Sequence, residues 1–161
     1  VAFIAAIEEH LPPVLGDPLR LRQVFTNLLD NAVKFTPSGG EVRMSASARS
    51  TSEPVSLGDA VVATLPERVE VTIADTGIGI PPHERENIFD PFYQVDASST
   101  RAFGGAGIGL SLVDRLVRAH GGEVRIASNE PFGTVFTVSL PVASAPAMRS
   151  TSAPLPMRDG R

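Results

Sequence analysis

The chain has 161 residues, of which 42% are hydrophobic and 20% charged, and this composition is ordinary for one globular domain with its own core. The formal net charge of −4 argues against a nucleic-acid binder that relies on a broad basic face. The absence of cysteine excludes disulfides and thiolate-bound zinc, and no apolar run is long enough to span a bilayer. Because the first residue is Val rather than Met, we expect the sequence to be an excerpt from a longer protein.

A strand is expected over residues 1–8 and a helix over residues 17–37. The helix has clear end signals: Asp17 is a favourable N-cap, Pro18 fits the first helical position, and a Pro-Ser-Gly-Gly run follows. At about 100° per residue, one arc of this helix is apolar, which predicts the face turned toward the core. That arc consists of Leu21, Phe25, Leu28, Leu29 and Ala32.

A column of polar side chains borders this apolar arc. Asn27, Asn31 and Lys34 are spaced i, i+4 and i+7, so that two amides and one cation line up along the helix. Polar groups at the edge of a core are unfavourable unless something binds them. The spacing alone leaves two interpretations open, a ligand-binding column or the solvated flank of an amphipathic helix.

The rest of the chain alternates between strands and helices. Apolar alternation and β-branched content predict strands over 41–47, 68–74, 123–128 and 133–140. Composition predicts a short helix over 82–88, a longer helix over 108–120, a hairpin loop over 49–66, a polar lid over 94–103 and a structureless segment from about 143. Strands interleaved with two long helices indicate a sheet covered by helices on one face.

Two glycine-rich stretches flank the lid. The first, residues 75–79, ends a strand with the carboxylate of Asp75, which suits the exocyclic amine of adenine, although Asp-Thr-Gly is also common turn chemistry. The second, residues 104–110, lacks the lysine of a P-loop because Leu110 stands in its place. It leads into a helix N-terminus, which suits a phosphate cradle or, without a ligand, a hinge.

Together and in order, these stretches resemble the catalytic ATP-binding domain of sensor histidine kinases, within the gyrase, Hsp90, histidine kinase and MutL (GHKL) superfamily. The resemblance covers about residues 3–142 and implies an α+β fold, a two-layer α/β sandwich in which a mixed, mostly antiparallel sheet has helices on one face. It divides the chain into a domain over 1–142 and a disordered tail or linker over 143–161. The motifs that carry it are the N box at 27–37, the G1 box at 75–79, the F box at 89–93, the lid end and G2 box at 101–110, and the closing strand at 133–136.

The resemblance implies ATP and Mg²⁺ as ligands. Asn31 would coordinate Mg²⁺, Asn27 would support the phosphate and metal end, and Lys34 would contact a phosphate. Asp75 would bind adenine N6, and Arg101 would stabilise charge on the γ-phosphate. The other implied nucleotide contacts are Phe35, Gly77, Gly79, Phe92, Gly105, Gly107, Ile108, Gly109, Leu110 and Thr134.

The implied function is that of the catalytic half of a two-component histidine kinase. Such a domain donates the γ-phosphate of ATP to a histidine on a separate dimerisation and phosphotransfer domain, which serves a response regulator. The alternative is an ATP-binding module that acts as a nucleotide-gated switch without kinase activity. Relatives of that kind carry a Glu, as general base for water, four residues before the metal-binding Asn, where this chain has Asn27.

Three features depart from the family pattern. Ala106 replaces a frequent Thr or Ser, the insertion at 49–66 is long, and none of the three histidines has the context of a phosphoacceptor. We expect a cytoplasmic domain that contacts neither nucleic acid nor membrane, and we leave open whether the parent protein is anchored in the inner membrane.

Overall fold

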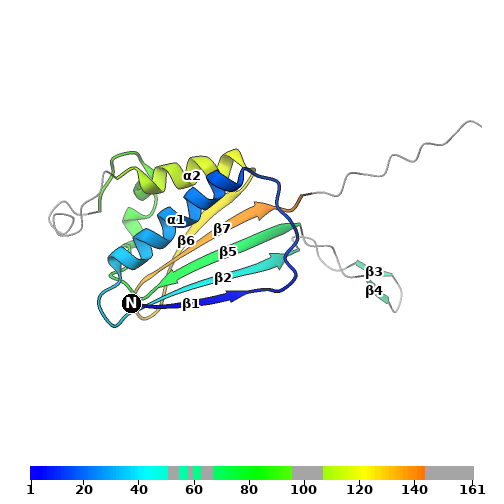
Figure 1. Cartoon of the computed structure of the whole chain (residues 1–161), viewed down its shortest axis with the longest axis horizontal. Coiled ribbons are helices and arrows are strands. Elements are labelled where there is room, and N and C mark those ends of the chain that lie inside the picture. The colour runs from blue at the N-terminus through cyan, green and yellow to red at the C-terminus, as the bar shows by residue number, and fades with distance from the viewer. Residues whose placement is uncertain (51–54, 58–59, 63–66, 96–106, 144–161) are drawn as a thin grey trace, which may run out of the picture.

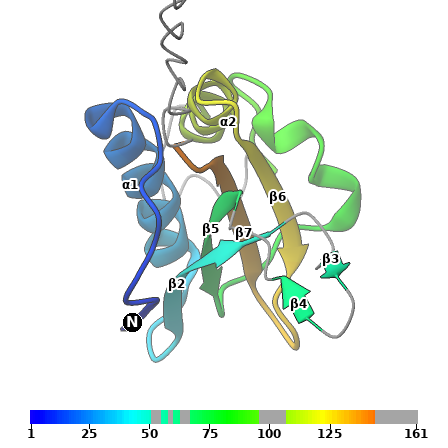
Figure 2. The same cartoon turned by 90° about the vertical axis from the view of Figure 1, so that its right-hand side faces the viewer.

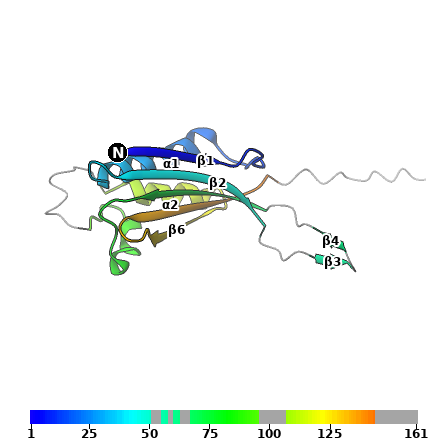
Figure 3. The ribbon, with the colours of Figure 1, turned by 90° about the horizontal axis from the view of Figure 1, so that it is seen from below.

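The computed structural model describes residues 1–50, 55–57, 60–62, 67–95 and 107–143. Five strands form one sheet in the order β1-β2-β5-β7-β6, and two α-helices cover one of its faces (Figures 1 and 3). The strands are β1 (Ala2–Ile7), β2 (Glu41–Arg49), β5 (Arg68–Asp75), β6 (Glu123–Ser128) and β7 (Thr134–Pro141), and the helices are α1 (Pro18–Phe35) and α2 (Gly109–Ala119). Among the described strands of this sheet, only the β1–β2 pair is parallel. The two-layer α+β fold with a mostly antiparallel sheet is therefore confirmed.

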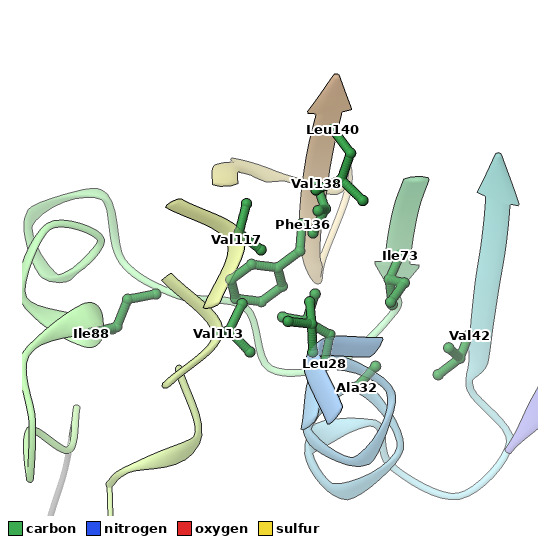
Figure 4. Close-up of a cluster of buried hydrophobic side chains, with 11 residues drawn as sticks. Leu28, Ala32, Val42, Ile73, Ile88, Val113, Val117, Phe136, Val138 and Leu140 are labelled. Carbon is green, nitrogen blue, oxygen red and sulfur yellow. The ribbon is translucent and has the colours of Figure 1, made fainter. Parts of the chain in front are cut away.

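The core lies between the helices and the sheet, and α1 and α2 also pack against each other (Figure 2). On β5, buried and half-buried residues alternate strictly, as expected for a strand with one face turned to the core. In the close-up, the ring of Phe136 on β7 lies beside Val113 and Val117 of α2 (Figure 4). The buried hydrophobic residues of the sheet are Val42, Ala46, Val69, Val71, Ile73, Phe136, Val138 and Leu140.

The buried face of α1 differs slightly from the predicted arc. Val24, Leu28 and Ala32 are its buried residues, whereas Leu21, Phe25 and Leu29 are half-buried. At about 100° per residue, Val24 lies close to the direction of Asn31, which is seven positions later on the helix. The polar column therefore borders the centre of the core more closely than the sequence pattern predicted.

Side chains hold both ends of α1. The carboxylate of Asp17 accepts hydrogen bonds from the amides of Leu19 at 2.8 Å and Arg20 at 3.2 Å, as the N-cap prediction required. The backbone amide of Asp17 donates to Nε2 of His120 at 3.0 Å, which ties the start of α1 to the end of α2. At the other end, the hydroxyl of Thr36 donates to the carbonyl of Ala32 at 2.6 Å, and the helix stops before Pro37.

One predicted segment differs from the structure. The helix predicted over 82–88 forms two 3₁₀ turns, η1 (Pro82–Glu84) and η2 (Asn87–Phe89), because a run this short does not sustain α-helical hydrogen bonding. The hairpin loop predicted over 49–66 agrees with the structure in its described residues, where two short antiparallel strands, β3 (Val55–Leu57) and β4 (Ala60–Val62), pair with each other. Residues 96–103 of the predicted lid, residues 104–106 of the second glycine-rich stretch and residues 144–161 of the predicted tail lie outside the described residues.

Removing the N-cap should destabilise the fold. We expect Asp17→Ala to lower the free energy of unfolding by about 1 kcal/mol, because two amide donors of the first turn of α1 lose their acceptor. The backbone bond to His120 survives this substitution, so the effect isolates the cap. Asp30→Ala on the exposed side of α1 is the matched control, and urea unfolding of both variants checks the difference. An equal effect of the two substitutions would show that the cap contributes nothing.

Candidate nucleotide-binding site

The last residue of the central strand β5 is a buried carboxylate. Asp75 is only 5% exposed, and its Oδ1 accepts hydrogen bonds from the backbone amides of Gly77 at 2.9 Å and Thr134 at 3.1 Å. Burial raises the pKa of Asp75 above its ordinary value, and the two amide bonds offset part of this rise. Both donors use the same oxygen, so the carboxyl group is fixed in orientation, and nothing within the described residues donates to Oδ2.

The loop after β5 packs tightly against the C-terminal end of α1. The amide of Ile78 donates to the carbonyl of Phe35 at 3.2 Å, and a Cβ at position 77 would lie 2.5 Å from that same carbonyl oxygen. Gly77 is therefore required for close packing within the protein, in addition to the access to a ligand for which the sequence suggested it. Beside this contact, Nζ of Lys34 lies 4.9 Å from the centre of the Phe35 ring, a cation–π geometry.

The polar column of α1 connects this loop to the start of α2. The amide nitrogen of Asn27 donates to the carbonyl of Gly109 at 3.5 Å, so the first turn of α2 lies against the middle of α1. Asn31 lies one turn further along the same face, between the Asn27 contact and the Phe35 contact. Its side-chain amide is half-buried and has no hydrogen-bond partner among the described residues. An amide oxygen in this position is available to a ligand or to a hard cation.

Gly107, in the glycine stretch before α2, packs against the segment that follows η2. The amide of Phe92 donates to the carbonyl of Gly107 at 3.0 Å, and Gly107 has a φ of +66°. A Cβ at position 107 would lie 2.8 Å from the carbonyl of Tyr93, so both the backbone conformation and the close approach require glycine. The segments on either side of residues 96–106 are thus joined directly.

Exposure differs among the remaining residues of this region. Phe92 is 73% exposed and Ile108, the residue before α2, is 45% exposed, whereas Leu110 packs against the core. Gly79 has a φ of +74°, and a Cβ there would approach the carbonyl of Gly133 at 3.3 Å. Arg101 and Gly105 lie outside the described residues, as does Ala106.

The structure therefore brings three predicted groups together. Asp75, Gly77 and Thr134 are joined by hydrogen bonds, Phe35 contacts the same loop, and Asn27 contacts Gly109. A buried acceptor, two amides and a cation along one helix, and the N-terminus of a second helix together suit a ligand that has an amine at one end and an anion at the other. In the described part of the chain, His and acidic side chains form no cluster of three that would suit a metal ion.

Sequence reasoning missed Asn129 and underrated Gly133. The side chain of Asn129 donates to the backbone carbonyl of Asp75 at 2.8 Å, across 54 positions in the sequence. Gly133 has a φ of +119°, and a Cβ there would lie 1.9 Å from the same carbonyl oxygen. The Gly-Thr pair at the start of β7 was a usable signal for Gly133, whereas Asn129 resembles any other residue of a polar turn.

Comparison with known proteins places the chain among ATP-binding domains. Residues 16–144 match the family described as "Histidine kinase-, DNA gyrase B-, and HSP90-like ATPase". Adaptive-response sensory kinase SasA of Trichormus variabilis is 40% identical over 136 residues, which is 84% of this chain and 30% of that protein. Hybrid signal transduction histidine kinase A of Dictyostelium discoideum is 37% identical over 143 residues, 88% of this chain and 6% of that protein.

Solved structures agree with these sequence relatives. The mycobacterial sensor histidine kinase MprB superposes with a TM-score of 0.66 at 30% identity, over 88% of this chain and 81% of that one. Full-length ShkA in complex with AMPPNP superposes with a TM-score of 0.69 at 36% identity, over 89% of this chain and 26% of that one.

The chain spans about a third of the SasA proteins that it matches, and neither α1 nor α2, in the described residues, has the length and hydropathy of a membrane-crossing helix. The fold, the motifs in register on it and the match over residues 16–144 show that the chain belongs to the histidine kinase, DNA gyrase B and HSP90-like ATPase family.

Proposed function

We propose that the chain is the catalytic ATP-binding domain of a two-component sensor histidine kinase. In this proposal it binds Mg-ATP and donates the γ-phosphate to a histidine on a separate dimerisation and phosphotransfer domain. The observation that carries the proposal is the Asp75 carboxylate, buried at the end of the central strand and held through one oxygen by the amides of Gly77 and Thr134. Its other oxygen is left to accept from an exocyclic amine.

Adenine recognition follows from this geometry. The N6 amine of adenine donates hydrogen bonds, and a carboxylate is a stronger acceptor for it than a neutral group. Phe35 lies at the adjoining end of α1, in contact with the same loop through its carbonyl, and supplies an aromatic surface at the base end.

The phosphates belong at the opposite end of the site. The start of α2, held by the Asn27–Gly109 contact, provides backbone amides and the positive end of a helix dipole. Lys34, which precedes Phe35, adds a cation on α1 between the base end and the start of α2, and the half-buried amide of Asn31 supplies an oxygen ligand of the kind that Mg²⁺ prefers. Bound Mg²⁺ would neutralise phosphate charge there. From outside the described residues, Arg101 is proposed to add a second cation near the γ-phosphate.

Phosphate donation is favoured over hydrolysis by the identity of one residue. Asn27 stands where a general base for water would be needed, and its amide cannot take a proton. The amide instead donates to Gly109 and so helps to hold α2 in place. The nucleotide-gated switch is therefore the weaker alternative.

The proposed partners follow from the same chemistry. The acceptor is a histidine on the dimerisation and phosphotransfer domain of the parent protein, and a response regulator receives the phosphate afterwards. We place the domain in the cytoplasm, where ATP is available, and propose no contact with nucleic acid or membrane.

Replacing the carboxylate should weaken nucleotide binding. We expect Asp75→Asn to reduce ATP affinity about ten- to a hundredfold. A charge-assisted hydrogen bond is lost, and the NH₂ group of the new side chain can face the N6 amine of adenine, which is also a donor. Titration calorimetry measures this directly, and an unchanged dissociation constant would refute the adenine assignment.

The same substitution should have the opposite effect on the stability of the nucleotide-free domain. Because burial raises the pKa of Asp75 in the folded state, the stability that this carboxyl contributes is fully present below its unfolded pKa and is lost as the pH rises through the folded value. Asn keeps an oxygen that accepts from Gly77 and Thr134 and carries no charge. In urea unfolding, the free energy of unfolding of the variant should therefore rise relative to wild type from pH 4 to 7. A trend in the other direction would mean that the hydrogen bonds from Gly77 and Thr134 affect the pKa of Asp75 more than its burial does.

Removing the proposed metal ligand should separate metal dependence from binding. We expect Asn31→Ala to reduce the gain in ATP affinity on adding Mg²⁺ by roughly tenfold or more. Even the loss of a residue that only supports a metal ligand commonly lowers metal affinity by that factor. Adenosine affinity should stay unchanged, because the base contacts remain. Gln23→Ala, two turns earlier on α1, is the control. Equal Mg²⁺ enhancement in wild type and Asn31→Ala would rule Asn31 out as the ligand.

The isolated chain should bind Mg-ATP but neither label itself nor hydrolyse ATP quickly. Phosphoryl transfer depends mainly on positioning and charge stabilisation, and the acceptor nucleophile has to come from another domain. Adding a cognate helical hairpin with its histidine and labelled ATP should produce acid-labile, base-stable phosphate on the hairpin. Strong self-labelling at His10, His83 or His120, or fast hydrolysis without a partner, would contradict the proposal.

A further inference from the structure

The turn between β6 and β7 is attached to the end of β5 by one side chain. The Asn129 side-chain nitrogen donates to the backbone carbonyl of Asp75 at 2.8 Å, and its backbone amide donates to the carbonyl of Gly133 at 3.1 Å. A carbonyl oxygen only accepts, so the nitrogen of the side-chain amide is the atom that faces it. Asn129 thus closes the turn with its main chain and binds Asp75 with its side chain.

This side chain acts where the regular strand pairing stops. The β5–β7 register ends at the pair Ala74–Val135, one residue before Asp75. At that point Gly133, with its φ of +119°, brings its α-carbon so close to the Asp75 carbonyl that no Cβ would fit. The Asn129 amide supplies to this carbonyl the donor that the strand ladder no longer provides.

The same turn delivers one of the two donors that orient the carboxylate. Thr134 follows Gly133 directly, and its amide donates to Oδ1 of Asp75 at 3.1 Å. The backbone and the side chain of Asp75 are therefore both held by the segment that Asn129 fastens. Without this fastening, the Thr134 amide could shift relative to β5, and the carboxyl group would lose one of its two fixed donors.

We propose that Asn129 is a positioning residue for base recognition, one that fixes Asp75 through the β6–β7 turn and so sets the preference of the site for a purine with an exocyclic amine. The inference rests on the proposed function, in which Asp75 accepts from adenine N6. Asn129 itself contacts no nucleotide in this scheme and acts only through Asp75 and Thr134.

The test compares ATP with purine riboside triphosphate, which lacks the exocyclic amine and keeps the phosphates. Calorimetry with Mg²⁺ gives the ratio of the two affinities for each protein. Wild type should prefer ATP about ten- to a hundredfold, as expected for a charge-assisted hydrogen bond. Asn129→Ala should reduce this preference about three- to tenfold, with little change in the affinity for purine riboside triphosphate. Asn129→Ser, whose side chain is shorter but polar, should behave in the same way and serves if the alanine variant folds poorly.

Ser128→Ala is the matched control. Ser128 is the neighbouring residue, and its hydroxyl accepts from Arg85 at 2.6 Å, so its loss removes one side-chain hydrogen bond near the same turn without touching Asp75. It should lower stability to a similar extent and leave the ATP preference within about twofold of wild type.

The outcomes separate the two proposals. If wild type binds both triphosphates equally or binds neither, the assignment of Asp75 to adenine fails. If wild type prefers ATP and both Asn129 variants keep the full preference, Asn129 is not a positioning residue, although the assignment of Asp75 stands. Loss of preference in Ser128→Ala as well would show that any disturbance near the turn has this effect, which would also overturn the role of Asn129.

Discussion

The site depends on two backbone amides that donate to one oxygen of a buried carboxylate. Gly77 and Thr134 lie 57 positions apart, yet both reach Oδ1 of Asp75 because β5 is the central strand, with the loop after it on one side and the start of β7 on the other. Burial alone would disfavour the charged group, as its raised pKa shows. The fold thus maintains an acceptor that is unfavourable without a ligand, and a donor from a ligand relieves that cost.

The glycines around this carboxylate serve packing as much as access. Gly77 lets the loop meet the carbonyl of Phe35, and Gly133 lets the β6–β7 turn meet the carbonyl of Asp75, at distances that exclude any Cβ. Since these contacts fix α1 and β7 relative to β5, a substitution at either glycine would disturb the site by moving its walls. Lost nucleotide binding in such a variant would not by itself identify a glycine–ligand contact.

Local signals in the sequence predicted most of the fold. The N-cap at Asp17, the helix end near Pro37 and the alternation in β5 each depend on neighbouring residues. The structure confirms the cap and the alternation, and it ends α1 at Phe35, two residues before the predicted end. The 3₁₀ turns after Pro81 were missed because a short, mostly polar run opened by prolines does not distinguish helix types. The role of Asn129 could not be predicted, since its partner lies 54 positions away and only the register of β5, β6 and β7 brings them together.

In the proposed function, one amide on α1 decides between phosphate transfer and hydrolysis. The Phe35 contact and the Asn27 contact lie eight residues apart, about 12 Å along the helix axis, so α1 would separate the proposed base end from the proposed phosphate end. A carboxylate at position 27 would place a proton acceptor beside the phosphate end, where water could be activated. Asn27 instead donates to Gly109 and secures α2. In the proposed function, the nucleotide would then be held at both ends without a base, and its terminal phosphate would be preserved until another domain supplies a nucleophile.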